Sequence, residues 1–243
     1  MIWTCVRARW SPFLILATVT TTVLAAGPAL AQSKPATYKG NAVRIGHGTA
    51  HTVVRTDTRG KPASISIVFT PGMLDGLPKA AKGADPDFPY LLPMPTKGPK
   101  TVVDHVVINW ESAGHPPPHV YDVPHFDFHF YLVSQAAQKE VAFKDEKDSG
   151  DPSQQPPAEL VPGGYIVPPG TAVSQMGVHA VNPSAPEFHN QPFTATFLYG
   201  YYNKQQTFIE PMAAGIPQVE AVILRPGDAA RLLHHAGRLS FGL

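Results

Sequence analysis

The chain has 243 residues, of which 43% are hydrophobic and 15% charged, and its formal net charge is +1 at pH 7. The near-neutral balance excludes nucleic acid as the main partner, because phosphate binding needs a clear basic excess. The hydrophobic content excludes a disordered, charge-rich chain. The 27 prolines disfavour long helices, and the single cysteine excludes a disulfide scaffold.

The N-terminal segment has the pattern of an export signal. Arg7 and Arg9 precede an apolar stretch at residues 12–26, and a small-x-small motif ends at Ala31. This pattern predicts a Sec-type signal peptide cleaved after Ala31, and therefore a periplasmic or secreted protein without a membrane partner after cleavage. The apolar stretch is shorter than the roughly 20 residues of a membrane-spanning helix. The predicted division is a signal peptide at 1–31 and a single β-rich domain at 32–243.

The first half of this domain predicts short strands joined by loops. Ile65, Ile67 and Phe69 recur at every second position, which is the period of a strand. Residues 78–100 contain six prolines and two glycines and predict a surface loop or arm. The other elements expected here are two short strands within 42–57, a strand at 101–110 and an extended connection at 114–124.

The most regular strand pattern begins at His125. Its aromatic or apolar positions alternate with polar ones: Phe126, Phe128, Phe130 and Leu132 against His125, Asp127, His129 and Tyr131. A period of two predicts a strand with one aromatic and one polar face. Ser134 then caps a short helix that ends near Phe143.

The second half predicts further strands around one hairpin. Asn203 and Lys204 form the tight turn between strands at 193–202 and 206–212. The other expected elements are a mobile loop at 144–160, strands at 164–168 and 174–182, and helices at 217–224 and 229–235. The spacing of βαβ units is absent, so antiparallel pairing is favoured. The fold class predicted is β-rich, a mainly antiparallel sheet or barrel with a few short helices.

Imidazoles and carboxylates occur together on the predicted strands, in a combination typical of divalent-metal sites. On a strand, His125 and His129 are about 13 Å apart, so they share one ion only if the rings lean together or the strand bulges. Asp127, about 6.6 Å from His129, is either a ligand or an acceptor for a histidine N–H. The predicted metal ligands are His125, His129, His179 and Glu210, with Asp127 and His115 as supporting residues or alternative ligands.

Zinc is the expected ion, ahead of copper. In a copper site, the thioether sulfur of Met176 or Met212 would be a further ligand. Two metal-free interpretations of the HFDFHFY strand stay open, a buried polar network and a solvated face. The other histidines are interpreted as surface or core residues: His47, His51, His105, His119, His189, His234 and His235. The sequence has no GxSxG, no HExxH and no glycine-rich phosphate loop.

Four segments together resemble a family of exported bacterial proteins of unknown function. They are SIVFTPGMLDGLP (66–78), GHPPPHVYDVPHFDFHFY (114–131), MGVHAVNP (176–183) and FLYGYYNKQQTFIEPM (197–212). The resemblance spans roughly residues 40–225 and implies that the HFDFHFY strand and the FIEPM hairpin share one site. Its pattern points to His115, His125, Asp127, His129, His179, Glu210 and Pro211. The chain departs from this pattern at Ala180 and in the insertion at 144–160. A weaker resemblance to the cupin barrel concerns the architecture alone.

Three functions are consistent with these features. The first is a periplasmic divalent-metal protein, with metal-dependent hydrolysis or lyase chemistry as the default reaction. The second is a non-catalytic structural or stress-related protein that works as a homo-oligomer. The third is a small-ligand-binding β-barrel whose pocket is walled by Tyr131, Tyr199 and Tyr201.

Overall fold

The computed structural model describes residues 34–143, 155–214 and 222–224, and these form two antiparallel sheets. The first sheet has the strand order β1-β3-β4-β12, with β2 paired to β3. Its strands are β1 (Thr37–Lys39), β2 (Val43–Ile45), β3 (Gly48–Thr56), β4 (Pro62–Phe69) and β12 (Val222–Leu224). The expected strands within 42–57 and around Ile65, Ile67 and Phe69 are therefore confirmed.

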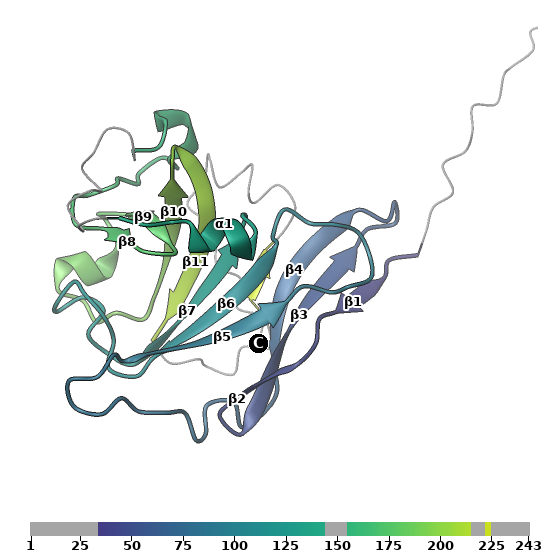
Figure 1. The fold of residues 1–243 in the computed structure, drawn as a ribbon, viewed down its shortest axis with the longest axis horizontal. Helices are drawn as coiled ribbons and strands as arrows, with labels where there is room; N and C mark the ends of the chain where they lie inside the picture. The colour runs from purple at the N-terminus through teal and green to yellow at the C-terminus, as the bar shows by residue number, and fades with distance from the viewer. Residues whose placement is uncertain (1–33, 144–154, 215–221, 225–243) are drawn as a thin grey trace, which may run out of the picture. The chain divides into compact units, whose positions relative to one another are not determined.

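The second sheet is larger, with the order β5-β6-β7-β11-β10-β9-β8. Its strands are β5 (Asp87–Pro93), β6 (His105–Glu111), β7 (His125–Tyr131), β8 (Ala172–Val173), β9 (Gly177–Ala180), β10 (Ala195–Tyr202) and β11 (Gln205–Ala213). Figure 1 shows β6, β7 and β11 at the centre of this sheet. Strand is the predominant secondary structure, at 41% against 7% helix, and one sheet is curled into a half-barrel, so the predicted β-rich, antiparallel class is confirmed.

Helical structure is short in the described ranges. It consists of α1 (Gln135–Lys139) and two 3-10 turns, η2 (Ala158–Leu160) and η3 (Pro186–His189). The Ser134 hydroxyl accepts a hydrogen bond from the Ala137 N–H, as a helix N-cap does, so the predicted cap is confirmed although the helix is shorter than expected. The expected signal peptide at 1–31, the expected helix at 229–235 and most of the expected loop at 144–160 fall on residues outside the described ranges.

Three sequence predictions are wrong. The strand expected at 164–168 is reduced to an isolated β-bridge between Ile166 and Val181, in a segment bounded by Gly164 and Pro168, residue types that weaken or interrupt strand pairing. Residues 78–100 are not only a loop, because β5 lies within them and pairs with β6 along its whole length. β5 is an edge strand, where a proline without an N–H costs no ladder hydrogen bond on its open side. The helix expected at 217–224 is wrong over 222–224, where β12 pairs with β4, and the rest of it falls outside the described residues.

The β10–β11 hairpin forms as predicted. Asn203 and Lys204 connect the strands, and both have positive φ angles, 48° and 64°. Two consecutive positive φ angles give the turn a twist that matches the flanking strands. The hairpin brings the FIEPM segment beside β7, because β11 pairs with β10 on one side and β7 on the other.

The apolar core lies between the two sheets. Phe126, Phe128 and Phe130 of β7 pack there with residues of the first sheet such as Ile45 and Ile67. The alternate side chains of β7 therefore face away from this core, and all seven residues of the strand are buried. The polar face of β7 is covered by other segments rather than by water.

Candidate metal centre

The polar face of β7 continues onto its neighbouring strands. In the β6–β7 register, Glu111 lies opposite His125 and Asn109 lies opposite Asp127. On the other side, Ile209 pairs with Phe130 and Met212 with Asp127, which sets Glu210 beside His129. Antiparallel pairing thus collects acids and imidazoles from three strands on one surface.

This surface is withdrawn from water. His125, Asp127, His129 and Glu210 are each at most 3% exposed, and Glu111 is 6% exposed. Part of the cover is aromatic, because the rings of Tyr121 and Phe193 lie 6.4 Å and 5.3 Å from the His125 ring. Burying so many ionisable groups is costly unless each finds a partner.

Three of the predicted residues form a first cluster, called here the Glu210 group. His129 Nε2 lies 3.2 Å from Glu210 Oε1, and His179 Nε2 lies 3.7 Å from Glu210 Oε2. His179 comes from β9, two strands away from β11, because β10 lies between them. The three candidate ligand atoms all lie within 4.8 Å of one another.

The remaining three residues form a second cluster, called here the Asp127 group. His125 Nε2 lies 3.1 Å from Asp127 Oδ1, and His115 Nε2 lies 3.3 Å from Asp127 Oδ2. His115 belongs to the connection between β6 and β7, which folds back over the sheet. These ligand atoms also lie within 4.8 Å of one another.

Hydrogen bonds fix the orientation of the histidines in the Glu210 group. His129 Nδ1 lies 3.0 Å from the Asn109 amide oxygen, whose NH₂ group donates to both carboxylate oxygens of Asp87. His179 Nδ1 lies 2.8 Å from the Thr171 carbonyl oxygen. Because both Nδ1 atoms face acceptors, they carry the ring hydrogen, and both Nε2 lone pairs face the carboxylate.

The Asp127 group repeats this arrangement with main-chain acceptors. His125 Nδ1 lies 2.6 Å from the Val123 carbonyl oxygen, and His115 Nδ1 lies 2.7 Å from that of Pro116. The Nε2 atoms again face the carboxylate. This is the orientation in which metal-binding histidines are held, with one nitrogen bound to an outer acceptor and the other free for an ion.

Four buried atoms of these groups have no hydrogen-bond partner. They are His125 Nε2, Asp127 Oδ1, His129 Nε2 and Glu210 Oε2. The short distances from Asp127 Oδ1 to His125 and from Glu210 to His129 and His179 are therefore not aligned hydrogen bonds. A proton on Glu210 would satisfy one imidazole at most, whereas a metal ion accepts lone pairs from both imidazoles and the carboxylate together.

Burial and neighbouring charges shift the pKa values in the Glu210 group. Burial, with the negative charges of Asp127 and Glu111, raises the pKa of Glu210 well above its usual value. Burial lowers the pKa of His129 to about 3, and it also lowers that of His179. Both imidazoles are therefore neutral at pH 7, which is the form that binds metals.

The pKa values in the Asp127 group are shifted in other directions. Burial opposes ionisation of Asp127, but His115 and His125 outweigh it and hold the pKa well below its usual value. Burial would also lower the pKa of His115, but the Asp127 carboxylate raises it to about 9. Burial, then the charges of Asp127 and Asp87, raises the pKa of Glu111 to about 8.

The structure thus brings all six sequence-predicted residues to one sheet face but divides them into two groups. His125, proposed from the sequence as a ligand beside His129, lies in the Asp127 group instead. Sequence reasoning missed the supporting roles of Asn109 and Asp87. The signal for Asn109 was its polar side chain on the strand expected at 101–110, but the polar positions of that strand do not alternate cleanly.

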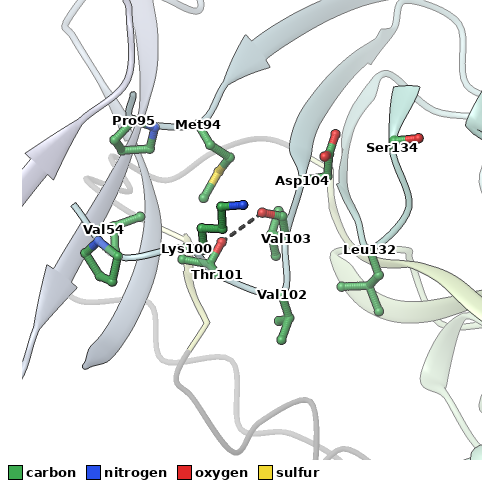
Figure 2. Close-up of a pocket in the computed structure, with 11 residues that line it drawn as sticks. Val54, Met94, Pro95, Lys100, Thr101, Val102, Val103, Asp104, Leu132 and Ser134 are labelled. Carbon is green, nitrogen blue, oxygen red and sulfur yellow. Dashed lines mark hydrogen bonds between the residues drawn. The ribbon is translucent and has the colours of Figure 1, made fainter. Parts of the chain in front are cut away.

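A pocket elsewhere in the molecule contains none of these six residues. Figure 2 shows Met94, Lys100, Asp104 and Leu132 around it, with the Thr101 hydroxyl donating to the Val103 carbonyl oxygen. Tyr131, Tyr199 and Tyr201, expected as walls of a ligand pocket, are instead at most 1% exposed. This pocket is therefore not the tyrosine-walled pocket expected from the sequence, because none of the three tyrosines lines it.

The fold and the site together define an antiparallel β protein with two buried histidine–carboxylate groups that could hold metal ions. Within the described ranges, no helix is long and apolar enough to cross a membrane. Residues 57–110 match a family model described as TTHB210-like, hypothetical protein TTHB210. The matched range covers β4, β5 and most of β6, and it includes Asp87 and Asn109 but none of the six candidate ligands. No match to the chain is found among curated proteins or among solved structures.

Proposed function

We propose that this chain is an exported protein that binds a divalent metal ion, preferably zinc, through His129, His179 and Glu210. The observation that carries the proposal is the pair of neutral imidazoles, each held at Nδ1 by an acceptor, with Nε2 facing a buried carboxylate. Nitrogen and oxygen donors of this kind suit zinc, and a set of three leaves a fourth coordination position for water. We infer that a bound ion would support hydrolytic or lyase chemistry at that position, and these are the reactions to be screened first.

A metal-free polar network is the competing explanation of the same residues. With Glu210 ionised, it would leave His129 Nε2 and Glu210 Oε2 without partners inside the protein, at a cost of about 1–3 kcal/mol for each unsatisfied group. With Glu210 protonated, the carboxyl group could donate to only one of the two imidazoles. His105 shows what a satisfied buried histidine looks like here, because its two ring nitrogens lie 2.9 Å from Asp104 and 2.8 Å from Gln138. The contrast between His105 and His129 favours the ion.

The test is the metal content of the mature protein, purified from the periplasm without an affinity tag. We expect bound metal in the wild type and loss of the ion at the Glu210 group in His129→Ala and in Glu210→Gln. Glu187→Gln is the matched control, because Glu187 is a carboxylate only 4% exposed that belongs to neither group. A folded wild type that contains no metal and is unchanged by added zinc or copper would refute the proposal.

A further inference from the structure

We propose that His115, His125 and Asp127 hold a second divalent ion of their own, which fastens the connection between β6 and β7 to the sheet. The inference does not depend on an ion at the Glu210 group, because the two sets share no side chain. Each set has two imidazoles and one carboxylate.

The Asp127 group has the features of a separate site. Asp127 and His129 are two residues apart on β7, about 6.6 Å along the strand. The Asp127 carboxylate therefore faces His115 and His125, whereas the Glu210 carboxylate faces His129 and His179. Asp127 Oδ1 and His125 Nε2 are both buried and both lack a hydrogen-bond partner, although they lie 3.1 Å apart. A metal ion bound to both atoms would explain why they face each other while buried and without a hydrogen bond between them.

The charges on the polar face support two ions rather than one. Four carboxylates interact with one another across this face: those of Asp87, Glu111, Asp127 and Glu210. Within the described part of the chain, no lysine or arginine forms an ion pair with any of them; the ion pairs of Asp127 and Glu210 are all with histidines. An ion in each group would place a positive charge beside Asp127 and beside Glu210, where the described residues supply no lysine or arginine.

The position of His115 explains what the second ion would do. His115 and Tyr121 lie in the connection between β6 and β7, and the main-chain N–H of His115 donates to the Tyr121 carbonyl oxygen. The Tyr121 ring packs against the ring of Phe193, with their centroids 4.9 Å apart. An ion held by His115 and two residues of β7 would therefore join the connection to the strand beneath it.

The two sites would differ in their access to water. The His115 side chain is 29% exposed, whereas those of His129 and Glu210 are 1% and 3% exposed. A chelator can therefore reach the second ion through His115 more readily than it can reach the first. We expect two phases of zinc release to a chromophoric chelator, with the fast phase from the Asp127 group.

The experiment counts zinc ions in the mature protein after dialysis against zinc, for four proteins. We expect two ions in the wild type, one in His115→Gln and one in Glu210→Gln. His119→Gln is the matched control, because His119 lies in the same connection but its side chain is 95% exposed and belongs to neither group, so two ions are expected. Near-ultraviolet circular dichroism checks that each variant is folded.

The outcomes separate this inference from the proposed function. If His115→Gln keeps as many ions as the wild type, the second site is refuted, whatever Glu210→Gln does. If zinc is lost in His115→Gln but not in Glu210→Gln, the second site stands and the proposed function fails. A single ion that either variant removes would mean one shared site and would overturn the inference of two.

Hydrogen exchange provides a second readout that metal counting does not. Zinc should slow amide exchange in residues 114–124 of the wild type and of Glu210→Gln. The same segment should stay unprotected in His115→Gln. Equal protection in all three proteins would show that no ion fastens this connection.

Discussion

The amide of Asn109 illustrates how one side chain can set the chemistry of another. Its NH₂ group donates to Asp87 at 2.9 Å and 3.0 Å, so its oxygen must face His129 Nδ1. That nitrogen then carries the ring hydrogen, and His129 Nε2 keeps a lone pair directed towards Glu210. A residue that touches no metal thereby selects the tautomer that can bind one.

Asn109→Ala should therefore weaken zinc binding at the Glu210 group. Loss of such an outer hydrogen bond typically lowers metal affinity by about 10- to 100-fold. The affinity is measured by competition with a chelator of known zinc affinity. Asp87→Asn should have a smaller effect in the same direction, because it weakens the hold on the amide without removing it.

The control for this prediction is His105→Gln, which alters a buried histidine outside both groups. It should leave zinc affinity unchanged. An Asn109→Ala protein that binds zinc as tightly as the wild type would show that Asn109 does not orient His129.

At the scale of the element, the β10–β11 hairpin shapes the Glu210 group through an aromatic side chain. The Phe208 ring lies 5.0 Å from the His129 ring and 5.2 Å from the His179 ring, at steep angles to both. Gly200 of β10 pairs with Phe208, and a Cβ added at Gly200 would overlap the Phe208 ring. The glycine thus provides the space for the Phe208 ring, which contacts both imidazoles.

Gly200→Ala should displace Phe208 and disturb the Glu210 group. Overpacking of this kind costs roughly 1–3 kcal/mol of unfolding free energy. Zinc affinity should fall at the Glu210 group and stay unchanged at the Asp127 group, as measured by chelator competition and chemical denaturation. The double variant Gly200→Ala/Phe208→Leu, with a smaller side chain, should recover part of the stability.

If Gly200→Ala were as stable as the wild type and bound zinc equally well, Phe208 would have no positioning role. A loss of stability with unchanged zinc affinity would limit Phe208 to packing. Gly83→Ala is a suitable comparison, because a Cβ there meets no neighbour, although its φ of 80° adds strain of its own.

Much of the strand pattern was predictable from the sequence because alternation is a local signal. The β7 pattern places Phe126, Phe128 and Phe130 in the core, as the structure has them. β5 was missed because its prolines, Pro89 and Pro93, are acceptable only on an edge strand, and the edge is a property of the whole sheet. β12 was missed because its pairing with β4 is also a long-range event.

At the scale of the whole molecule, the sequence identified the residue types of the site but not their division. His125 and His129 both face the polar side of β7, and nothing local assigns them to different groups. The division depends on which residue arrives from elsewhere: His115 from the connection and His179 from β9. The topology of the sheet and its connections decides this grouping, and the alternation of residues along one strand does not predict it.

The same clustering makes the stability of the metal-free protein depend on pH in a defined direction. Burial raises the pKa of Glu111 to about 8 and that of Glu210 well above its usual value, and Asp127 raises the pKa of His115 to about 9. At pH 6.5 the unfolded chain has already released the two glutamate protons and is releasing the histidine proton, whereas the folded protein holds all three. Stability therefore falls as pH rises from 6.5 to 9.

Other groups change this expectation little within the chosen window. The lowered pKa values of His129 and His179 reduce stability mainly below about pH 7, where the unfolded chain becomes protonated, and they add only a small opposing slope at the start of the window. The lowered pKa of Asp127 matters only in stronger acid, near and below the usual aspartate pKa. The direction between pH 6.5 and 9 is thus set by the three groups with raised values.

We expect the chelator-treated protein to unfold at lower urea concentration at pH 9 than at pH 6.5, and Glu111→Gln to reduce that difference. Glutamine resembles the protonated carboxyl group and does not titrate, so one of the three contributions disappears. Zinc should stabilise the protein more at pH 9 than at pH 6.5, since fewer protons then compete with the ion for Glu210 and His115. A metal-free protein that becomes more stable over this range would mean that these carboxyl groups are already ionised at pH 6.5, and the buried acids would then need a counter-charge other than a metal.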